Sequence, residues 1–145
     1  TDAVDRADEV FALHHYAKEE DYLFHHAVSV AIVSAFLAKK LSYSKGEWIQ
    51  IGVAGALCDC GMARLSSRFF RNKEELTSHE REEMKKHPVY SYEMLKAIPG
   101  LKEGVLLAVS QHHERVDGGG YPLGIRGEQL HPYSKIVAEL GRAHV

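Results

Sequence analysis

Apolar residues along this chain recur every three or four positions, the spacing that lines one face of an α-helix. The segment from Tyr22 to Leu41 carries apolar residues around most of its circumference, which is typical of a helix buried within its domain. No stretch alternates strictly between apolar and polar residues, as a half-buried strand does. The pattern predicts an all-α domain with helices over Asp2–Glu20, Tyr22–Leu41, Ser44–Gly61, Thr77–Lys86, Pro88–Ile98, Leu101–His113 and Pro132–Val145.

Three short-range signals mark where individual helices begin. Ser44 and Thr77 each have a glutamate three residues later, which predicts a capping box at the first turn of a helix. Pro88 interrupts the helical pattern and suits the first position of a new helix. The segment 114–131 contains glycines and a proline, and irregular segments of this length are commonly functional.

The overall composition narrows the class of protein. A length of 145 residues and a net charge of −2 predict one globular domain that binds no nucleic-acid polymer. The longest apolar run, Ala27–Ala38, is too short to span a bilayer, so we expect no membrane insertion. Cys58 and Cys60 are too close in sequence to bridge each other, which fits a reducing cytoplasm. Because the chain begins with Thr1 and not with Met, we expect a piece of a longer protein, and we expect the last helix, Pro132–Val145, to be truncated at its C-terminal end.

Ten histidines are many for a chain of this length and raise the expectation of a metal site. Candidate ligands lie within apolar helices or at predicted helix ends: His26, Cys58, Asp59, His87, His112 and His113. Each of them alone also fits a structural role, as a core histidine, a helix cap or a small buried residue. Together, imidazoles and one carboxylate form a suitable ligand set for iron, manganese, zinc or nickel.

The most distinctive stretch follows the histidine pair. It contains Asp117, Gly118, Gly119, Gly120, Tyr121 and Pro122. Glycines permit positive φ angles and close passage of the backbone beside a ligand. An ordinary surface turn after a solvated histidine pair is the simpler alternative. The pair can face one cavity only if its helix ends there, because successive helical residues point about 100° apart.

These motifs resemble the HD-GYP domain, a branch of the HD metal-dependent phosphohydrolases. The resemblance runs from about Tyr22 to Gly141 and is most specific in the run His-His-Glu-Arg-Val-Asp-Gly-Gly-Gly-Tyr-Pro at 112–122. It implies an HD-domain-like bundle of about six to seven helices, within a cytoplasmic bacterial signalling protein of several domains. It also implies hydrolysis of cyclic di-GMP by two or three metal ions, which neutralise the phosphodiester and activate a bridging water.

The resemblance also divides the candidate ligands between two metal ions. One ion would take Asp59, His87, His112 and His113. The other would share Asp59, the bridging catalytic carboxylate, with His26 and with two ligands that this chain lacks. The chain therefore retains all ligands of one site and part of the other.

Four positions depart from the family pattern. Cys58 replaces the histidine of the His-Asp pair, Met62 replaces a lysine near the substrate phosphate, and Gly141 replaces a metal-binding aspartate. Tyr22 stands where members with three metals carry a glutamate. We therefore expect one bound divalent metal, and a second only if the Cys58 thiolate serves as a substitute ligand.

Three hypotheses follow for the function. The first is a regulatory module with weak or no phosphodiesterase activity, which binds cyclic di-GMP or a related nucleotide, or contacts a diguanylate cyclase or another signalling domain. The second is an active metal-dependent phosphohydrolase of cyclic di-GMP that uses Cys58 as a ligand. The third is a metal-free helical interaction module. The candidate phosphate-binding residues, which also fit the role of solvated surface charges, are Arg115, Arg126 and Lys135.

Overall fold

The computed structural model describes residues 22–66, 69 and 76–142, and the regular secondary structure within these ranges is helical. The elements are α3 (Tyr22–Lys40), α4 (Lys45–Leu57), the 3-10 helix η2 (Cys60–Arg64), α6 (Ser78–Met84), α7 (His87–Leu95), α8 (Glu103–Gln111) and α9 (Pro132–Arg142). The described residues contain no strand, only an isolated bridge between Asp117 and Arg126. The predicted all-α fold is confirmed, and the predicted helix Asp2–Glu20 lies outside the described residues.

Both predicted capping boxes are present. The side chain of Ser44 accepts a hydrogen bond from the N–H of Glu47, and the Glu47 carboxylate accepts one from the N–H of Ser44. Thr77 and Glu80 make the same reciprocal pair at the start of α6. Pro88 lies in the first turn of α7, where a missing N–H removes no intrahelical hydrogen bond.

Several helix ends differ from the predicted ones. α4 ends at Leu57 rather than at Gly61, because the chain turns there and continues as η2. α7 ends at Leu95, before the predicted Ile98. α8 spans Glu103–Gln111, two residues shorter at each end than the predicted Leu101–His113. These shorter helices leave irregular backbone beside the histidines and the aspartate.

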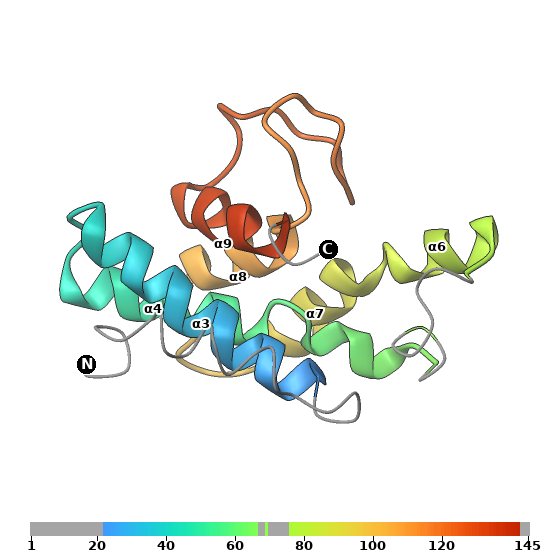
Figure 1. The fold of residues 1–145 in the computed structure, drawn as a ribbon, viewed down its shortest axis with the longest axis horizontal. Coiled ribbons are helices and arrows are strands. Elements are labelled where there is room, and N and C mark those ends of the chain that lie inside the picture. Colours follow the sequence, from blue (N-terminus) through green and yellow to red (C-terminus); the bar gives the residue numbers. More distant parts are fainter. Residues whose placement is uncertain (1–21, 67–68, 70–75, 143–145) are drawn as a thin grey trace.

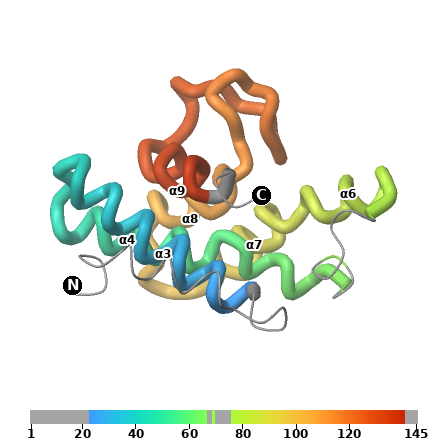
Figure 2. Tube along the Cα trace, viewed as in Figure 1, coloured from blue at the N-terminus to red at the C-terminus, as the bar shows by residue number. Residues whose placement is uncertain are grey.

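α4 lies in the middle of the bundle, where it packs against α3, α8 and α9 (Figure 1). α7 packs against η2 and α8, so it joins the second half of the chain to the end of α4. The segment 114–131 arches away from the helices between α8 and α9 (Figure 2). The C-terminal end of α8 thereby lies at the base of this loop, and α7 packs against α8.

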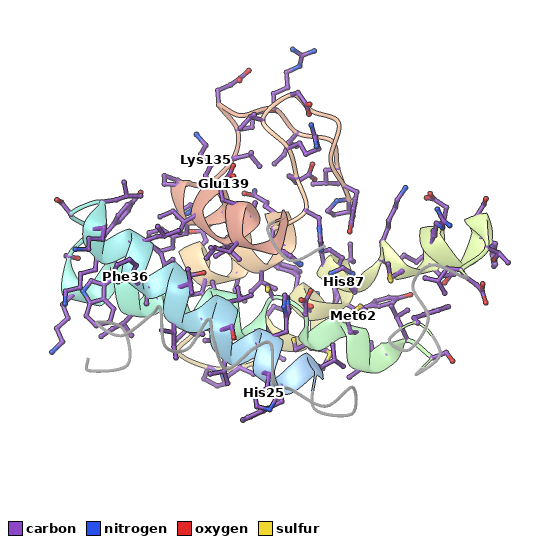
Figure 3. All side chains as sticks on the ribbon, viewed as in Figure 1. His25, Phe36, Met62, His87, Lys135 and Glu139 are labelled. Carbon is purple, nitrogen blue, oxygen red and sulfur yellow. The ribbon has the colours of Figure 1, made fainter. Side chains whose placement is uncertain are left out.

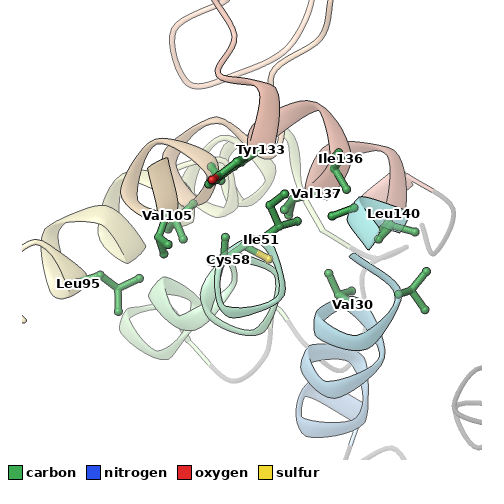
Figure 4. Packing of buried hydrophobic residues seen from close by; sticks show 14 residues of the cluster. Val30, Ile51, Cys58, Leu95, Val105, Tyr133, Ile136, Val137 and Leu140 are labelled. Atoms are coloured by element: carbon green, nitrogen blue, oxygen red, sulfur yellow. The ribbon is translucent and has the colours of Figure 1, made fainter. Parts of the chain in front are cut away.

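The hydrophobic core is drawn from α3, α4, α7, α8 and α9 (Figure 4). Val30, Ile51, Val105 and Val137 are among its fully buried members. α3 and α4 can approach closely because α4 presents glycine to α3. A Cβ on Gly55 would lie 3.0 Å from the Val30 carbonyl oxygen.

The segment Leu23–Lys40 of α3 is long and apolar enough to cross a membrane, a criterion that the core helix of a soluble protein also meets. In this structure α3 packs against α4 and α9. The sequence-based expectation of no membrane insertion stays a prediction.

Candidate metal centre

The carboxylate of Asp59 lies at the turn between α4 and η2, and a buried serine holds this turn in place. Ser91 of α7 donates a hydrogen bond to the carbonyl oxygen of Cys58 at 2.7 Å. Its hydroxyl oxygen also accepts one from the N–H of Gly61 at 2.7 Å. Ser91 is fully buried, so both bonds are shielded from water. The direction of the Asp59 side chain is therefore tied to α7.

Two buried histidines face one oxygen of this carboxylate. His87 begins α7, and His112 ends α8 as its C-cap. The Nε2 atoms of His87 and His112 lie 3.1 and 3.2 Å from Oδ1 of Asp59. The two Nε2 atoms lie 3.2 Å from each other. Three ligand atoms from three separate segments therefore point at one position.

Backbone carbonyls determine which ring nitrogen carries the proton. Nδ1 of His87 donates to the carbonyl oxygen of Met84 at 2.7 Å. Nδ1 of His112 donates to that of Val109 at 2.7 Å. A carbonyl oxygen can only accept, so the neutral rings present lone pairs at Nε2 toward Asp59. Lone pairs and a carboxylate in mutual contact repel one another unless a proton or a metal ion lies between them, and histidines whose other ring nitrogen donates to a backbone carbonyl are characteristic of metal sites.

His113 completes the cluster. One ligand atom from each of Asp59, His87, His112 and His113 lies within 4.8 Å of the others. The ring of His113 stacks on that of Tyr121, with 4.7 Å between centroids and 14° between planes. The N–H of Tyr121 also donates to the His113 carbonyl oxygen at 3.1 Å. The loop at Gly120-Tyr121-Pro122 thus holds His113, the fourth candidate ligand, in place. The set of one carboxylate and three imidazoles fits a divalent metal ion.

The second carboxylate oxygen faces α3. Nε2 of His26 lies 3.5 Å from Oδ2 of Asp59, opposite the side used by His87 and His112. Asp59 therefore has one oxygen near His87 and His112 and the other near His26. Gly141 lies in the last turn of α9 and supplies no ligand atom from a side chain.

Protons and a metal ion compete for this centre. Burial by itself raises the pKa of Asp59, but hydrogen bonds from His112, His26 and His87 outweigh it and hold that pKa well below its usual range. The same imidazole nitrogens must lose their protons to bind a metal. Metal affinity therefore falls as the pH is lowered.

Cys58 is part of the apolar core and is absent from the cluster. Its side chain is buried, and its thiol donates to the carbonyl oxygen of Gly55 at 3.3 Å (Figure 4). Burial raises the pKa of the Cys58 thiol well above its usual range, and the charge of Asp59 adds to this. A thiolate ligand needs the opposite shift. The structure therefore favours the interpretation of Cys58 as a small buried residue.

We expect the thiol of Cys58 to resist modification by DTNB at pH 8 in the folded protein. Burial raises the pKa of both thiols, but Cys60 is only partly buried and should react first. A Cys60→Ser variant isolates Cys58 and should react only after urea unfolds it. Rapid reaction of that folded variant would contradict the core assignment and restore Cys58 as a candidate ligand.

Glu114 organises the long loop, a role that the sequence analysis did not identify. Its side chain is buried and accepts hydrogen bonds from the N–H groups of Leu123, Gly124 and Ile125 at 2.6, 3.2 and 3.2 Å. The feature of the sequence that could have indicated this role is the position of a carboxylate directly after the histidine pair. Ser91 gave no such signal, because one serine on a helix is unremarkable until its neighbours are known.

The three consecutive glycines serve different purposes. Gly118 has a φ of +80°, a conformation that favours glycine. A Cβ on Gly120 would lie 2.5 Å from the Cα of Glu114 and from the carbonyl oxygen of His113. Gly119 is exposed and its N–H donates to Asp117 at 2.8 Å. The sequence predicted that these glycines let the backbone pass close to a ligand. At Gly120 the close contact is instead with the chain's own backbone at 113–115.

The candidate phosphate-binding residues are spread over the surface. Arg115 and Asp117 are exposed and form a two-pronged ion pair, which lowers the pKa of Asp117 to about 2. Arg115 also lines a hollow of about 160 Å³ together with His112 and His113. Arg126 is exposed on the loop, and Lys135 projects from the outer side of α9, away from His87 (Figure 3). Only Arg115 is brought beside the cluster.

Comparison with known proteins agrees with this geometry. The chain belongs to the HD domain family, whose profile matches residues 13–140. It is 35% identical over 108 residues to the cyclic di-GMP phosphodiesterase response regulator RpfG of Xanthomonas campestris, covering 73% of this chain and 28% of that protein. It is 28% identical over 117 residues to the cyclic di-GMP phosphodiesterase PdeB of Borreliella burgdorferi, covering 81% and 31%. The predicted kinship with HD-GYP phosphodiesterases is confirmed.

Two further matches lie at lower sequence identity, the second of them in fold. A 3'3'-cGAMP-specific phosphodiesterase of Vibrio cholerae is 27% identical over 116 residues, covering 80% of this chain and 25% of that protein. The structure of Bd1817, a HDG"Y"P protein from Bdellovibrio bacteriovorus, matches with a TM-score of 0.71 at 23% identity, covering 81% of this chain and 39% of that chain. The chain spans about a quarter to a third of the length of the curated relatives it matches.

Proposed function

We propose that this domain binds one divalent metal ion and, through it, a cyclic dinucleotide, and that it acts as a regulatory module with little phosphodiesterase activity. The observation that carries the proposal is the cluster of Asp59, His87, His112 and His113, whose ligand atoms lie within 4.8 Å of one another. The second side of Asp59 is met by His26 at 3.5 Å. One site is complete in ligand residues, and the other has two of them.

The chemistry of phosphodiester hydrolysis explains why this difference matters. A bound metal ion would supply positive charge for a phosphate, and efficient hydrolysis uses two such ions to orient attack and activate water. Here Asp59 holds one oxygen toward the complete site, and Met62 offers neither charge nor a proton. Each tenfold loss of rate corresponds to about 1.4 kcal/mol of transition-state stabilisation. The incomplete second metal site and the lack of a cation at Met62 together predict a large loss of hydrolysis rate.

The named relatives support the ligand class. They act on cyclic di-GMP or 3'3'-cGAMP, both cyclic dinucleotides. We propose the same class of ligand for this domain, within a cytoplasmic protein of several domains. A diguanylate cyclase or another signalling domain is the proposed protein partner, through the segment Asp117–Pro122.

Metal content per chain tests the proposal. Protein purified without a metal-affinity column and supplied with iron, manganese or zinc should carry about one metal ion per chain by ICP mass spectrometry. Asp59→Ala should carry almost none, because the carboxylate contacts the other ligand residues. Glu93→Ala removes an exposed carboxylate that pairs with Lys96, and its metal content should match that of the wild type. Absence of metal in the wild type would support a metal-free interaction module instead.

A second candidate function is an active phosphohydrolase. The contact between His26 and Oδ2 of Asp59 favours it, because a carboxylate with ligand residues at both oxygens is suited to bridge two metal ions. This candidate requires about two metal ions per chain. It also requires hydrolysis of cyclic di-GMP or bis-p-nitrophenyl phosphate that disappears in Asp59→Ala.

A further inference from the structure

The charge of the metal centre leaves part of a cyclic dinucleotide uncompensated. One divalent cation and the carboxylate of Asp59 together leave a single net positive charge, because ligating imidazoles are neutral. A cyclic dinucleotide carries two phosphate charges. One further cation beside the centre would therefore stabilise a bound ligand, and Met62 cannot supply it. This step rests on the function proposed above.

A lysine on α6 lies beside the ring that supports His113. Lys85 is the C-cap of α6 and precedes His87 by two residues. Its Nζ lies 5.9 Å from the ring centroid of Tyr121, within the range of a cation–π contact. The ring of Tyr121 in turn lies 4.7 Å from that of His113 and 6.5 Å from that of His87.

The present partner of Lys85 is weakly held. Nζ lies 2.7 Å from Oε1 of Glu82, in a pair whose side chains are 46% and 67% exposed. Exposed pairs of this kind contribute little stability, because water screens both charges. Lys85 can therefore exchange Glu82 for a ligand phosphate without a large cost.

The other cations near the loop are less suitable. Arg115 is held by several hydrogen bonds to Asp117, whose carboxylate is itself fixed by the N–H of Gly119, whereas Lys85 has a single contact to Glu82. Lys135 projects from the outer side of α9 (Figure 3). We propose that Lys85 is a ligand-binding residue of this centre and contacts a phosphate of the cyclic dinucleotide.

The adjacent lysine offers a matched control. Lys86 is also exposed and pairs with a glutamate three residues earlier, Glu83. Lys86 lies near Tyr90 of α7, whereas Lys85 lies over the ring of Tyr121. Lys85 and Lys86 thus share net charge, pairing and exposure, and differ in position relative to the metal centre.

The test measures binding of cyclic di-GMP to Mn²⁺-loaded protein by isothermal titration calorimetry. Lys85→Met should weaken binding about fivefold to tenfold, as expected for loss of one charge-assisted contact near the surface. Lys85→Arg should stay within about twofold of the wild type, and Lys86→Met should leave the dissociation constant unchanged. Manganese content should be the same in all four proteins.

A second readout locates the contact directly. Cyclic di-GMP should protect Lys85, and not Lys86, from acetylation by a limiting reagent, as read by peptide mass spectrometry. Wild-type protein that carries metal but binds no cyclic di-GMP would overturn both the proposed ligand and the role of Lys85. Equal binding by wild type and Lys85→Met, or equal losses in Lys85→Met and Lys86→Met, would overturn the role of Lys85 alone.

Discussion

Replacing Gly61 with alanine should lower the free energy of unfolding by at least about 3 kcal/mol. A Cβ at this position would lie 2.2 Å from the carbonyl oxygen of His87 and 2.4 Å from the backbone nitrogen of Ser91. Both are backbone atoms of α7, so no side-chain rotation relieves the contact. The added methyl group must push η2 away from α7, and with it Asp59 away from His87. Urea unfolding followed by circular dichroism measures the effect.

Gly46 provides the control for this substitution. It lies in the first turn of α4, and a Cβ built there meets no atom within 4 Å. Gly46→Ala should therefore be neutral or stabilise the protein by up to about 1 kcal/mol, because alanine is the better helix former. Failure of Gly61→Ala to fold would agree with the prediction. A stable Gly61→Ala protein with normal metal content would show that η2 and α7 are packed less tightly than described.

Replacing Glu114 with alanine should lower the free energy of unfolding by about 2–4 kcal/mol. The substitution removes three hydrogen bonds from the N–H groups of Leu123, Gly124 and Ile125 to a buried carboxylate. The free energy of unfolding of Glu114→Gln should lie between those of the wild type and Glu114→Ala. The glutamine side chain keeps one acceptor oxygen, but its NH2 group would face backbone N–H groups of the loop, which are also donors. Urea unfolding measures the loss, and hydrogen exchange should show faster exchange at these three amides.

A second glutamate on the same loop is the control for Glu114. Glu128 is exposed, and its substitution by alanine should change the free energy of unfolding by no more than about 0.5 kcal/mol. Unchanged amide exchange at 123–125 in Glu114→Ala would contradict the role assigned to this carboxylate. A loss confined to those amides, without a change in the unfolding midpoint, would mean that the loop opens separately from the helices.

The histidine pair illustrates how far a local pattern can lead. The sequence predicted that His112 and His113 share one site only if their helix ends beside them. In the structure α8 ends at Gln111, and the two rings lie 4.2 Å apart. The condition came from helical geometry alone, and the structure meets it where Glu114, the residue after the pair, binds the loop at 123–125.

The turn at Asp59 illustrates where local pattern fails. Apolar residues continue past Leu57, so the predicted helix ran on to Gly61. The observed change to η2 depends on Ser91, which follows Cys58 by 33 residues and bonds to its carbonyl oxygen. No periodicity within α4 contains that information. For the same reason, the sequence left open whether Cys58 was a thiolate ligand or a core residue.

The sequence by itself determined the all-α class, the capped starts of α4 and α6, and the family, because these depend on short-range spacing and on an unusual motif. Only the tertiary structure decided that Asp59 faces His87 and His112 with one oxygen and His26 with the other. It also placed Lys85 beside Tyr121 and buried Cys58 in the core. These relations join residues far apart in the chain, and their distances are set by the packing of α3, α4, α7 and α8 rather than by any local preference.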